Sequence, residues 1–176
     1  MNTTRTTVLA GLSSSNATLY HRIRFLAPDS SVIIDFADGG SIYIVRDIEM
    51  DRARGAVRTD RVCCAADFKP EGGLSGDRDT ALAQAAAECL RQAGENTVTV
   101  DRTLPYLYAH SIREAGIGIE YSADFGVRER RVKDAAEIEH LRHAQKVTGE
   151  AIAVACRTIA NATPDRDGIL HVDGAI

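Results

Sequence analysis

The chain has 176 residues, of which 44% are hydrophobic and 26% charged, an ordinary composition for a globular protein with room for one real core. A net charge of −4, only 5% aromatic residues and no tryptophan exclude a basic nucleic-acid-binding protein that stacks bases on its side chains. The apolar runs are short, as in Val32-Ile33-Ile34, and none approaches the roughly 18 residues of a transmembrane helix. We therefore expect a cytoplasmic protein without a nucleic-acid or membrane partner.

Helical and extended patterns alternate along the first two thirds of the chain. Residues 1–13 show no sustained period and are expected to be a flexible N-terminus. The predicted elements are, in chain order, a helix through Leu19, Ile23 and Leu26, strands over 31–36 and 41–46, a helix over 48–54, a strand over 61–68, a helix over 80–93, a strand over 97–101, a helix over 103–115 and a strand over 116–121. This order predicts an α/β domain with a mixed β-sheet flanked by helices.

Glycine-rich segments mark two connections. Asp38-Gly39-Gly40 separates the first two strands and predicts an antiparallel hairpin. Residues 69–79 contain one proline and three glycines and are expected to form a surface loop. Within this loop, Gly72-Gly73-Leu74-Ser75-Gly76 lacks the Lys-Ser/Thr end of a phosphate-binding loop, so we do not assign it to phosphate binding.

A long amphipathic helix is predicted near the C-terminus. From Ile138 to Ile159, an apolar stripe recurs at spacings of three and four with a weak centre at Gln145 and Thr148, and the helical pattern continues to about Ala162. Such a helix is roughly 40 Å long, more than a small sheet needs as cover. We expect part of its apolar face, at Ile152, Ala155 and Ile159, to form an interface with another domain or a second copy of the chain. The alternative is a helix that folds back on its own sheet.

The last residues give an expectation about the extent of the protein. The segment Thr163-Pro164-Asp165-Arg166-Asp167-Gly168 ends the helix, and the sequence stops at Ile176 within a new apolar segment. We expect the chain to be the front part of a larger protein.

The residues around the start of this helix resemble a known family. Arg130-Arg131-Val132-Lys133-Asp134, followed by Glu137-Ile138, is similar to the segment that joins the two domains of the creatinase / aminopeptidase P / prolidase family of pita-bread metallopeptidases. Upstream, Asp47-Ile48-Glu49 with Arg52-Ala53, and Val100-Asp101 with Leu104-Pro105, are similar to the N-terminal domain of that family. The resemblance covers roughly residues 16–160.

The resemblance implies a fold and a division of the chain. The N-terminal domain of the family is a ribonuclease-H-like α/β domain without the nuclease carboxylates, and a long linking helix follows it. We therefore expect a flexible segment over 1–13, the N-terminal domain over 14–130, and the linking helix with the start of a catalytic domain over 131–176. The resemblance places the domain junction at Arg130, Arg131, Lys133 and Glu137.

The resemblance also implies what the chain does. The catalytic domain of the family binds two divalent ions, expected to be Mn, Co or Zn, through ligands that would lie beyond Ile176. We therefore expect no catalytic, cofactor or metal site in this chain. Its expected role is to form homodimers and to shape substrate access in an Xaa-Pro aminopeptidase or dipeptidase, with its own catalytic domain as partner. Creatine-type amidine hydrolysis, which uses no metal, is an alternative for the whole protein.

Two local patterns share features with metal sites. Glu137, His140 and His143 recur every three residues, but no HExxH motif is present, so a solvated helix face is favoured over zinc binding. Asp165-x-Asp167-Gly168 has part of the spacing of a calcium loop but lacks the distal Glu, which favours a polar turn.

The residues allow alternative functions for the basic cluster and for the chain as a whole. The basic cluster of Arg128, Arg130, Arg131 and Lys133 suits a domain junction, although anion binding is the alternative. A stand-alone α/β module that binds a small molecule or an anion is the second hypothesis for the chain. A Cys-dependent enzyme is the third. It is ranked lowest because the four cysteines, Cys63, Cys64, Cys89 and Cys156, are expected to be buried apolar residues.

Overall fold

The computed structural model describes residues 5–172, which divide into two units at Arg131/Val132. The first unit is an α/β domain, and the second contains one long helix and a short hairpin. Each unit is described by itself below. Within the described residues, no helix is long and apolar enough to cross a membrane.

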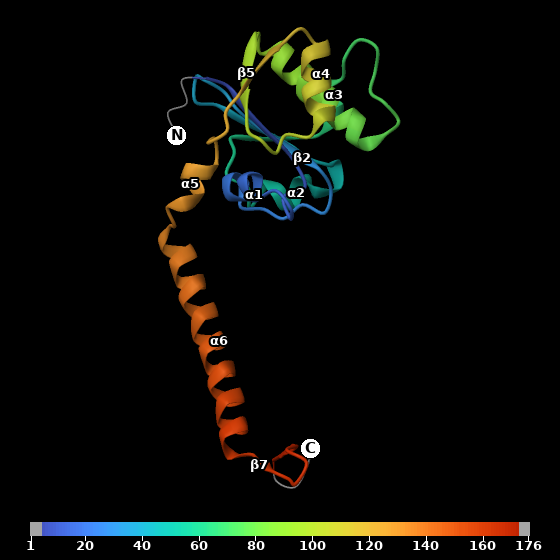
Figure 1. Ribbon diagram of the computed structural model, residues 1–176. Helices are drawn as coiled ribbons and strands as arrows, with labels where there is room; N and C mark the ends of the chain where they lie inside the picture. The colour runs from blue at the N-terminus through green and yellow to red at the C-terminus, as the bar shows by residue number, and fades with distance from the viewer. Residues whose placement is uncertain (1–4, 173–176) are drawn as a thin grey trace. The chain divides into compact units, whose positions relative to one another are not determined.

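A six-stranded mixed sheet forms the centre of the first unit (Figure 1). Its strands, in spatial order, are β4 (Arg61–Cys63), β3 (Ser41–Ile44), β2 (Ser31–Asp35), β1 (Thr7–Gly11), β5 (Thr97–Val100) and β6 (Gly118–Tyr121). Strands β1, β2 and β3 are antiparallel neighbours, whereas β4 pairs parallel to β3, β5 parallel to β1, and β6 parallel to β5. The mixed sheet flanked by helices confirms the fold class predicted from the sequence.

Helices cover both faces of the sheet. The helical elements of this unit are α1 (Ala17–Ile23), η1 (Asp47–Glu49), α2 (Met50–Arg54), η2 (Ala65–Phe68), α3 (Arg78–Gln92), α4 (Tyr106–Glu114) and α5 (Val127–Arg131). Figure 1 shows α1 and α2 on one face and α3 and α4 on the other. The parallel connections require this cover, because parallel strands are joined by crossovers that run over a face of the sheet.

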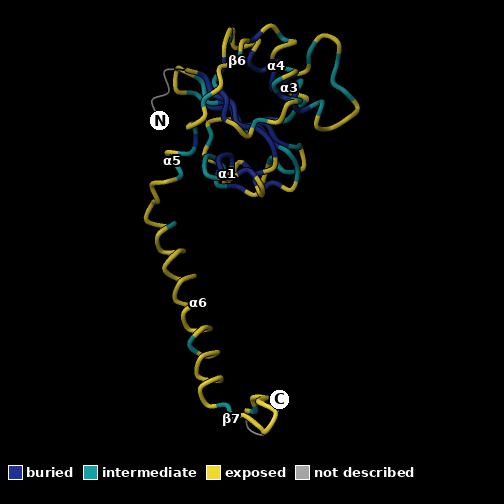
Figure 2. The backbone as a smooth tube through the Cα atoms, in the orientation of Figure 1, coloured by how far each residue is buried: buried dark blue, intermediate teal, exposed yellow. Residues whose placement is uncertain are grey.

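Alternating side chains of the central strands form two separate cores. In β2, Val32 and Ile34 pack into the cluster under α3 and α4, whereas Ile33 packs with Leu19 and Ile23 of α1. Strands β1 and β3 divide in the same way. The three strands are therefore buried on both sides, which explains why their sequences are almost continuously apolar (Figure 2).

The predicted hairpin is confirmed. Strands β2 and β3 are antiparallel, with Val32 opposite Ile44. The Phe36 N–H donates to the Gly40 carbonyl at 2.8 Å, and Gly39 adopts a φ of +99°. That left-handed backbone favours glycine, which is why the turn signal of the sequence was reliable here.

Two expectations about strands were wrong. Residues 7–11 are not flexible: they form β1, every residue of which is buried between β2 and β5. Residues 1–4 lie outside the described residues. The strand expected over 61–68 ends at Cys63, because Asp67 accepts a hydrogen bond from the Cys64 N–H at 2.8 Å and turns the chain into η2.

The second unit starts with the long helix. Helix α6 (Ala135–Asn161) has 27 residues, and none of them is buried (Figure 2). Asp134 is its N-cap and forms a capping box with Glu137, which fixes the start of the helix. The long C-terminal helix predicted from the spacing is thus confirmed.

A short hairpin follows the helix. Strands β7 (Thr163–Pro164) and β8 (Leu170–His171) pair antiparallel. Between them, one Asp165 carboxylate oxygen accepts hydrogen bonds from the N–H groups of Asp167 and Ile169, both at 2.9 Å. His171 beside Asp165 lowers the pKa of that carboxyl. This segment is the polar turn that the sequence favoured.

Candidate functional site

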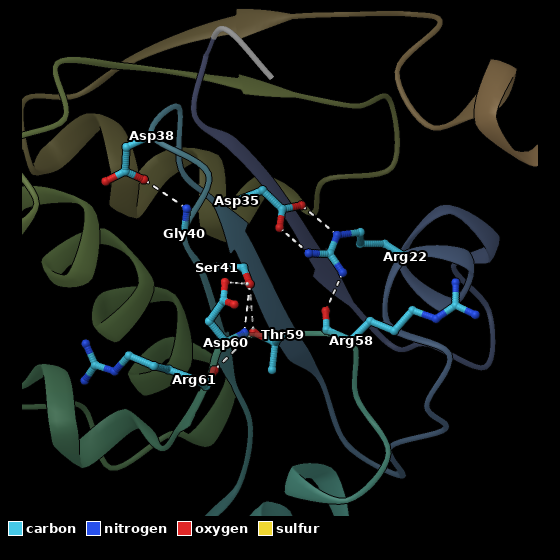
Figure 3. Close-up of polar contacts among 9 residues, drawn as sticks. All are labelled: Arg22, Asp35, Asp38, Gly40, Ser41, Arg58, Thr59, Asp60 and Arg61. Carbon is cyan, nitrogen blue, oxygen red and sulfur yellow. Dashed lines mark hydrogen bonds and ion pairs between the residues drawn. The ribbon is translucent and has the colours of Figure 1, made fainter. Parts of the chain in front are cut away.

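A polar cleft lies where β2, β3 and the segment before β4 meet α1 (Figure 3). It encloses about 480 Å³. Its lining comes from four stretches of the chain and comprises His21, Arg22, Asp35, Phe36, Gly39, Gly40, Ser41, Arg58, Thr59 and Asp60. The antiparallel β2–β3 hairpin brings Asp35 and Ser41 together as register partners, and this pairing builds the cleft around the end of the hairpin.

Arg22 and Asp35 form the inner wall. Arg22 lies in the last turn of α1, and Asp35 is the last residue of β2. The Arg22 Nε donates to Asp35 Oδ2 at 2.8 Å, and a second guanidinium nitrogen pairs with Asp35 Oδ1, so the contact is bidentate. The third nitrogen donates to the carbonyl of Arg58. The Arg22 side chain thus connects α1, β2 and the loop before β4 through hydrogen bonds.

Ser41 fixes the opposite wall. Its side chain is 8% exposed, and its hydroxyl donates to Asp60 Oδ2 at 2.7 Å. The same oxygen accepts the Asp60 N–H at 2.9 Å and lies 3.3 Å from the Thr59 hydroxyl. The carboxylate of Asp60 is therefore held in one orientation by a buried partner.

The chemistry available in this cleft is that of binding. Its charged groups are the two arginines and the two aspartates named above, with His21 beside them. Ser41 is occupied by a carboxylate and a backbone donor, so it is not placed as a nucleophile next to a general base. Fixed hydrogen-bonding groups around an open cleft suit recognition of a polar partner.

A second cleft, of about 630 Å³, lies between the end of β3, η2 and the start of α3. It is lined by four aspartates and two arginines, Asp29, Asp47, Asp77, Asp79, Arg46 and Arg78. Asp29 pairs with Arg46 at 2.5 Å and raises the pKa of that guanidinium. Asp77 is the N-cap of α3, and its hydrogen bonds from Thr80 lower the pKa of the carboxyl. Structural roles therefore account for Asp29, Arg46 and Asp77.

The predicted junction residues lie on both sides of the division at Arg131/Val132. Arg130 and Arg131 end α5, and the Arg130 Nε donates to the Gly126 carbonyl at 3.0 Å. Lys133 precedes the N-cap of α6 and is exposed. Glu137 belongs to the capping box of α6.

The residues predicted as an interface lie on α6. The side chains of Ile152 and Ile159 are 59% and 63% exposed, and Ala155 is exposed as well. Further exposed apolar residues of the helix are Leu141, Val147 and Val154. The interface itself stays a prediction.

The local patterns considered as metal sites do not form one among the described residues. Between residues 5 and 172, no group of three His, Cys, Asp or Glu side chains could hold a metal ion. His140 and His143 are exposed on α6. No step of a reaction is therefore assigned to a metal in this chain.

The cysteines only partly follow the expectation. Cys63 and Cys89 are buried, and burial raises the pKa of both thiols, that of Cys89 to about 12. A thiol with such a pKa is not a nucleophile near neutral pH. Cys64 is half-buried, and Cys156 is exposed on α6, so the expectation that all four are buried was wrong.

No family model matches the chain, and no curated protein matches its sequence. Among solved structures, the chain is similar to a prolidase from Pyrococcus furiosus, with a TM-score of 0.61 and 17% identity over 93% of this chain and 42% of that one. It is similar to an Xaa-Pro dipeptidase from Bacillus anthracis, with a TM-score of 0.68 and 13% identity over 93% of this chain and 41% of that one. It is also similar to an X-Pro aminopeptidase from Thermotoga maritima, with a TM-score of 0.65 and 15% identity over 93% of this chain and 43% of that one.

The fold is shared with Xaa-Pro peptidases. The fold that the sequence resemblance implied is thereby confirmed. The chain spans about two fifths of the length of these peptidases.

The sequence did not point to the polar cleft. Its residues come from α1, β2, β3 and the loop before β4, and no motif links these positions. The one local signal was the Asp38-Gly39-Gly40 turn, which predicted that Asp35 and Ser41 would be near neighbours. The pairing of Arg22 with Asp35 depends on tertiary packing and has no signature in the chain.

Proposed function

We propose that this chain is the N-terminal, non-catalytic domain of a cytoplasmic Xaa-Pro aminopeptidase or dipeptidase. In this proposal the reaction of the whole protein is metal-assisted hydrolysis of a peptide bond next to proline. The catalytic domain and its two divalent ions (Mn, Co or Zn) come from a part of the protein that this chain lacks.

One observation carries the proposal. The similarity extends over 93% of this chain but only 41–43% of the three peptidases.

The role of the domain in the proposal is assembly and control of access. Helix α6 has apolar side chains at Ile152 and Ile159 that no part of the described chain buries. Apolar stripes of this kind normally contact a partner. We infer that α6 contacts the protein's own catalytic domain or a second copy, so that the first unit is held beside a substrate site.

The test compares this chain with the product of the full coding region. With Mn²⁺, Co²⁺ or Zn²⁺ added, the chain alone is expected to leave Ala-Pro intact, whereas the longer product is expected to hydrolyse it. Release of free proline is the measurement. Hydrolysis by the chain alone would refute the non-catalytic role, and an inactive longer product would refute the peptidase assignment.

A further inference from the structure

Three exposed apolar side chains of the first unit lie at one edge of its sheet. Leu12 follows β1 and Ile48 follows β3, and these strands run in the same direction because both are antiparallel to β2. Leu26 precedes β2, so it belongs to the same edge. The exposed fractions of Leu12, Leu26 and Ile48 are 41%, 56% and 66%. We call these three residues the apolar rim.

A hydrogen bond joins two of the segments that carry the apolar rim. The Ala27 N–H donates to the Ser13 hydroxyl at 3.0 Å. The chain neighbours of these two residues, Leu26 and Leu12, therefore lie on adjacent segments.

Arg52 of α2 joins the third segment. Its guanidinium donates to the Leu26 carbonyl at 2.6 Å and pairs with Glu49 at 3.0 Å, and Glu49 directly follows Ile48. The same guanidinium lies 4.6 Å from the centre of the Phe25 ring. Single exposed apolar side chains are common on protein surfaces and need no partner. The apolar rim differs from such residues because its three segments are held beside one another.

Helix α6 has a surface of the same chemical character. Ile152 and Ile159 are 59% and 63% exposed, and Cys156 shares their face because it lies four residues after Ile152. The positions of this face between residues 138 and 159, which are 138, 141, 145, 148, 152, 155, 156 and 159, hold no charged side chain. An uncharged stripe of this kind suits an apolar surface in which the nearby cation Arg52 is already paired with Glu49.

We propose that the α6 stripe of one copy packs on the apolar rim of a second copy, and the reverse, in a twofold dimer. This exchange covers both exposed apolar surfaces with one kind of contact, whereas a contact between two rims would leave both α6 stripes in water. Because the contact occurs twice, each one needs to bury only about half of the roughly 1,600 Å² that is typical of a stable interface. The inference rests on the assembly role in the proposed function and not on the peptidase assignment.

The experiment is cross-linking of the whole chain with a short bis-maleimide, in an equal mixture of 14N- and 15N-labelled protein. Cys156 is exposed on α6 and supplies one thiol, and Ile48→Cys places a second thiol on the apolar rim. Mass spectrometry is expected to find peptides of mixed isotope that join position 48 of one chain to Cys156 of another. Adding Cys156→Ser should abolish this product. The matched control is Tyr20→Cys, an exposed position of α1 outside the rim, which should give no link to Cys156.

A second measurement removes the apolar rim. Leu26→Glu with Ile48→Glu is expected to lower the mass found by light scattering from twice 19.0 kDa to 19.0 kDa, with an unchanged circular dichroism spectrum. Tyr20→Glu should leave the dimer intact. The proposal is overturned by a monomeric unaltered chain, by links only between two Cys156 residues or only within single chains, or by a dimer that survives the rim substitutions. No readout measures peptide hydrolysis, so the dimer and the peptidase assignment can fail separately.

Discussion

Gly126 lies directly before α5 and packs against Thr18 of α1. It is buried, has a φ of +73°, and a Cβ built on it would lie 1.9 Å from Cγ2 of Thr18. Its carbonyl also accepts from Arg130. Glycine is therefore required here both by the backbone conformation and by the lack of space.

We predict that Gly126→Ala destabilises the first unit by about 2 kcal/mol or more, since it combines an overpacked contact with a strained φ. Urea unfolding measures the loss, and amide hydrogen exchange should show faster exchange over residues 124–131 than in the unaltered chain. Thr18→Ser removes the clashing methyl group, so the double variant should recover part of the stability. The control is Gly55→Ala, where φ is −86° and the new Cβ meets nothing within 4 Å. An equal effect of both alanines would contradict the argument.

Glu88 is a buried carboxylate whose hydrogen bonds lower its pKa. It is 7% exposed in α3, and Arg91 binds both of its carboxylate oxygens at 2.7 Å while Gln92 donates at 2.9 Å. The bonds from Arg91, and then those from Gln92, lower the pKa of Glu88 to about 2 from an ordinary value of 4.5. The folded state thus favours the ionised carboxylate.

We predict a pH-dependent loss of stability that Glu88→Gln removes. Because the folded pKa lies below the unfolded one, the stabilisation is fully present above pH 4.5 and is lost as the pH falls from 4.5 to about 2. Its size is expected to be about 1 kcal/mol, since Arg91 is largely exposed. Unfolding free energies measured across this window should fall less steeply for Glu88→Gln than for the exposed control Glu114→Gln. Identical slopes would show that Glu88 does not contribute.

At the scale of the elements, the sequence predicted the long or strongly marked ones and missed those set by tertiary contacts. Helix α6 was predicted because its spacing is regular and Asp134 and Glu137 mark its start. Strand β1 was missed because five residues buried on both faces show no alternation, and the flanking threonines and arginine looked like a loose terminus. Strand β4 was predicted too long because the Asp67 turn competes with the strand locally.

The same helix gives a prediction about assembly. Ile152 and Ile159 are seven residues apart, and therefore share one face of α6. If this face joins two copies of the chain, Ile152→Glu with Ile159→Glu should produce a monomer, because charges would be buried without partners. Arg157→Glu changes the charge on a different face and is the matched control.

Light scattering on a size-exclusion column measures the mass of each variant. We expect a dimer for the unaltered chain and for Arg157→Glu, and a monomer for the double variant. A monomeric unaltered chain would remove the second copy as occupant of this face and leave the catalytic domain as its proposed partner. Circular dichroism checks that α6 is still helical in the double variant.

Across the whole molecule, the site was harder to predict than the fold. The fold follows from periodicity and turn residues, which act over a few positions. The polar cleft joins Arg22, Asp35, Ser41 and Asp60, and depends on how a helix, a hairpin and a loop pack together. An Arg or Asp on a solvated face has the same local pattern as one that closes a cleft. Only the tertiary arrangement distinguishes them.

The separation into two units gives the last prediction. Every buried hydrophobic residue of the described chain lies between Val8 and Ile117, and α6 contributes none. A chain that ends at Arg131 should therefore keep its core, and its melting temperature should stay within a few degrees of that of the 176-residue chain. Trypsin under native conditions should cut first near Arg131 and Lys133, which are exposed. A drop of more than about 10 °C, roughly 2 kcal/mol for a domain of this size, would mean that residues after Arg131 stabilise the first unit.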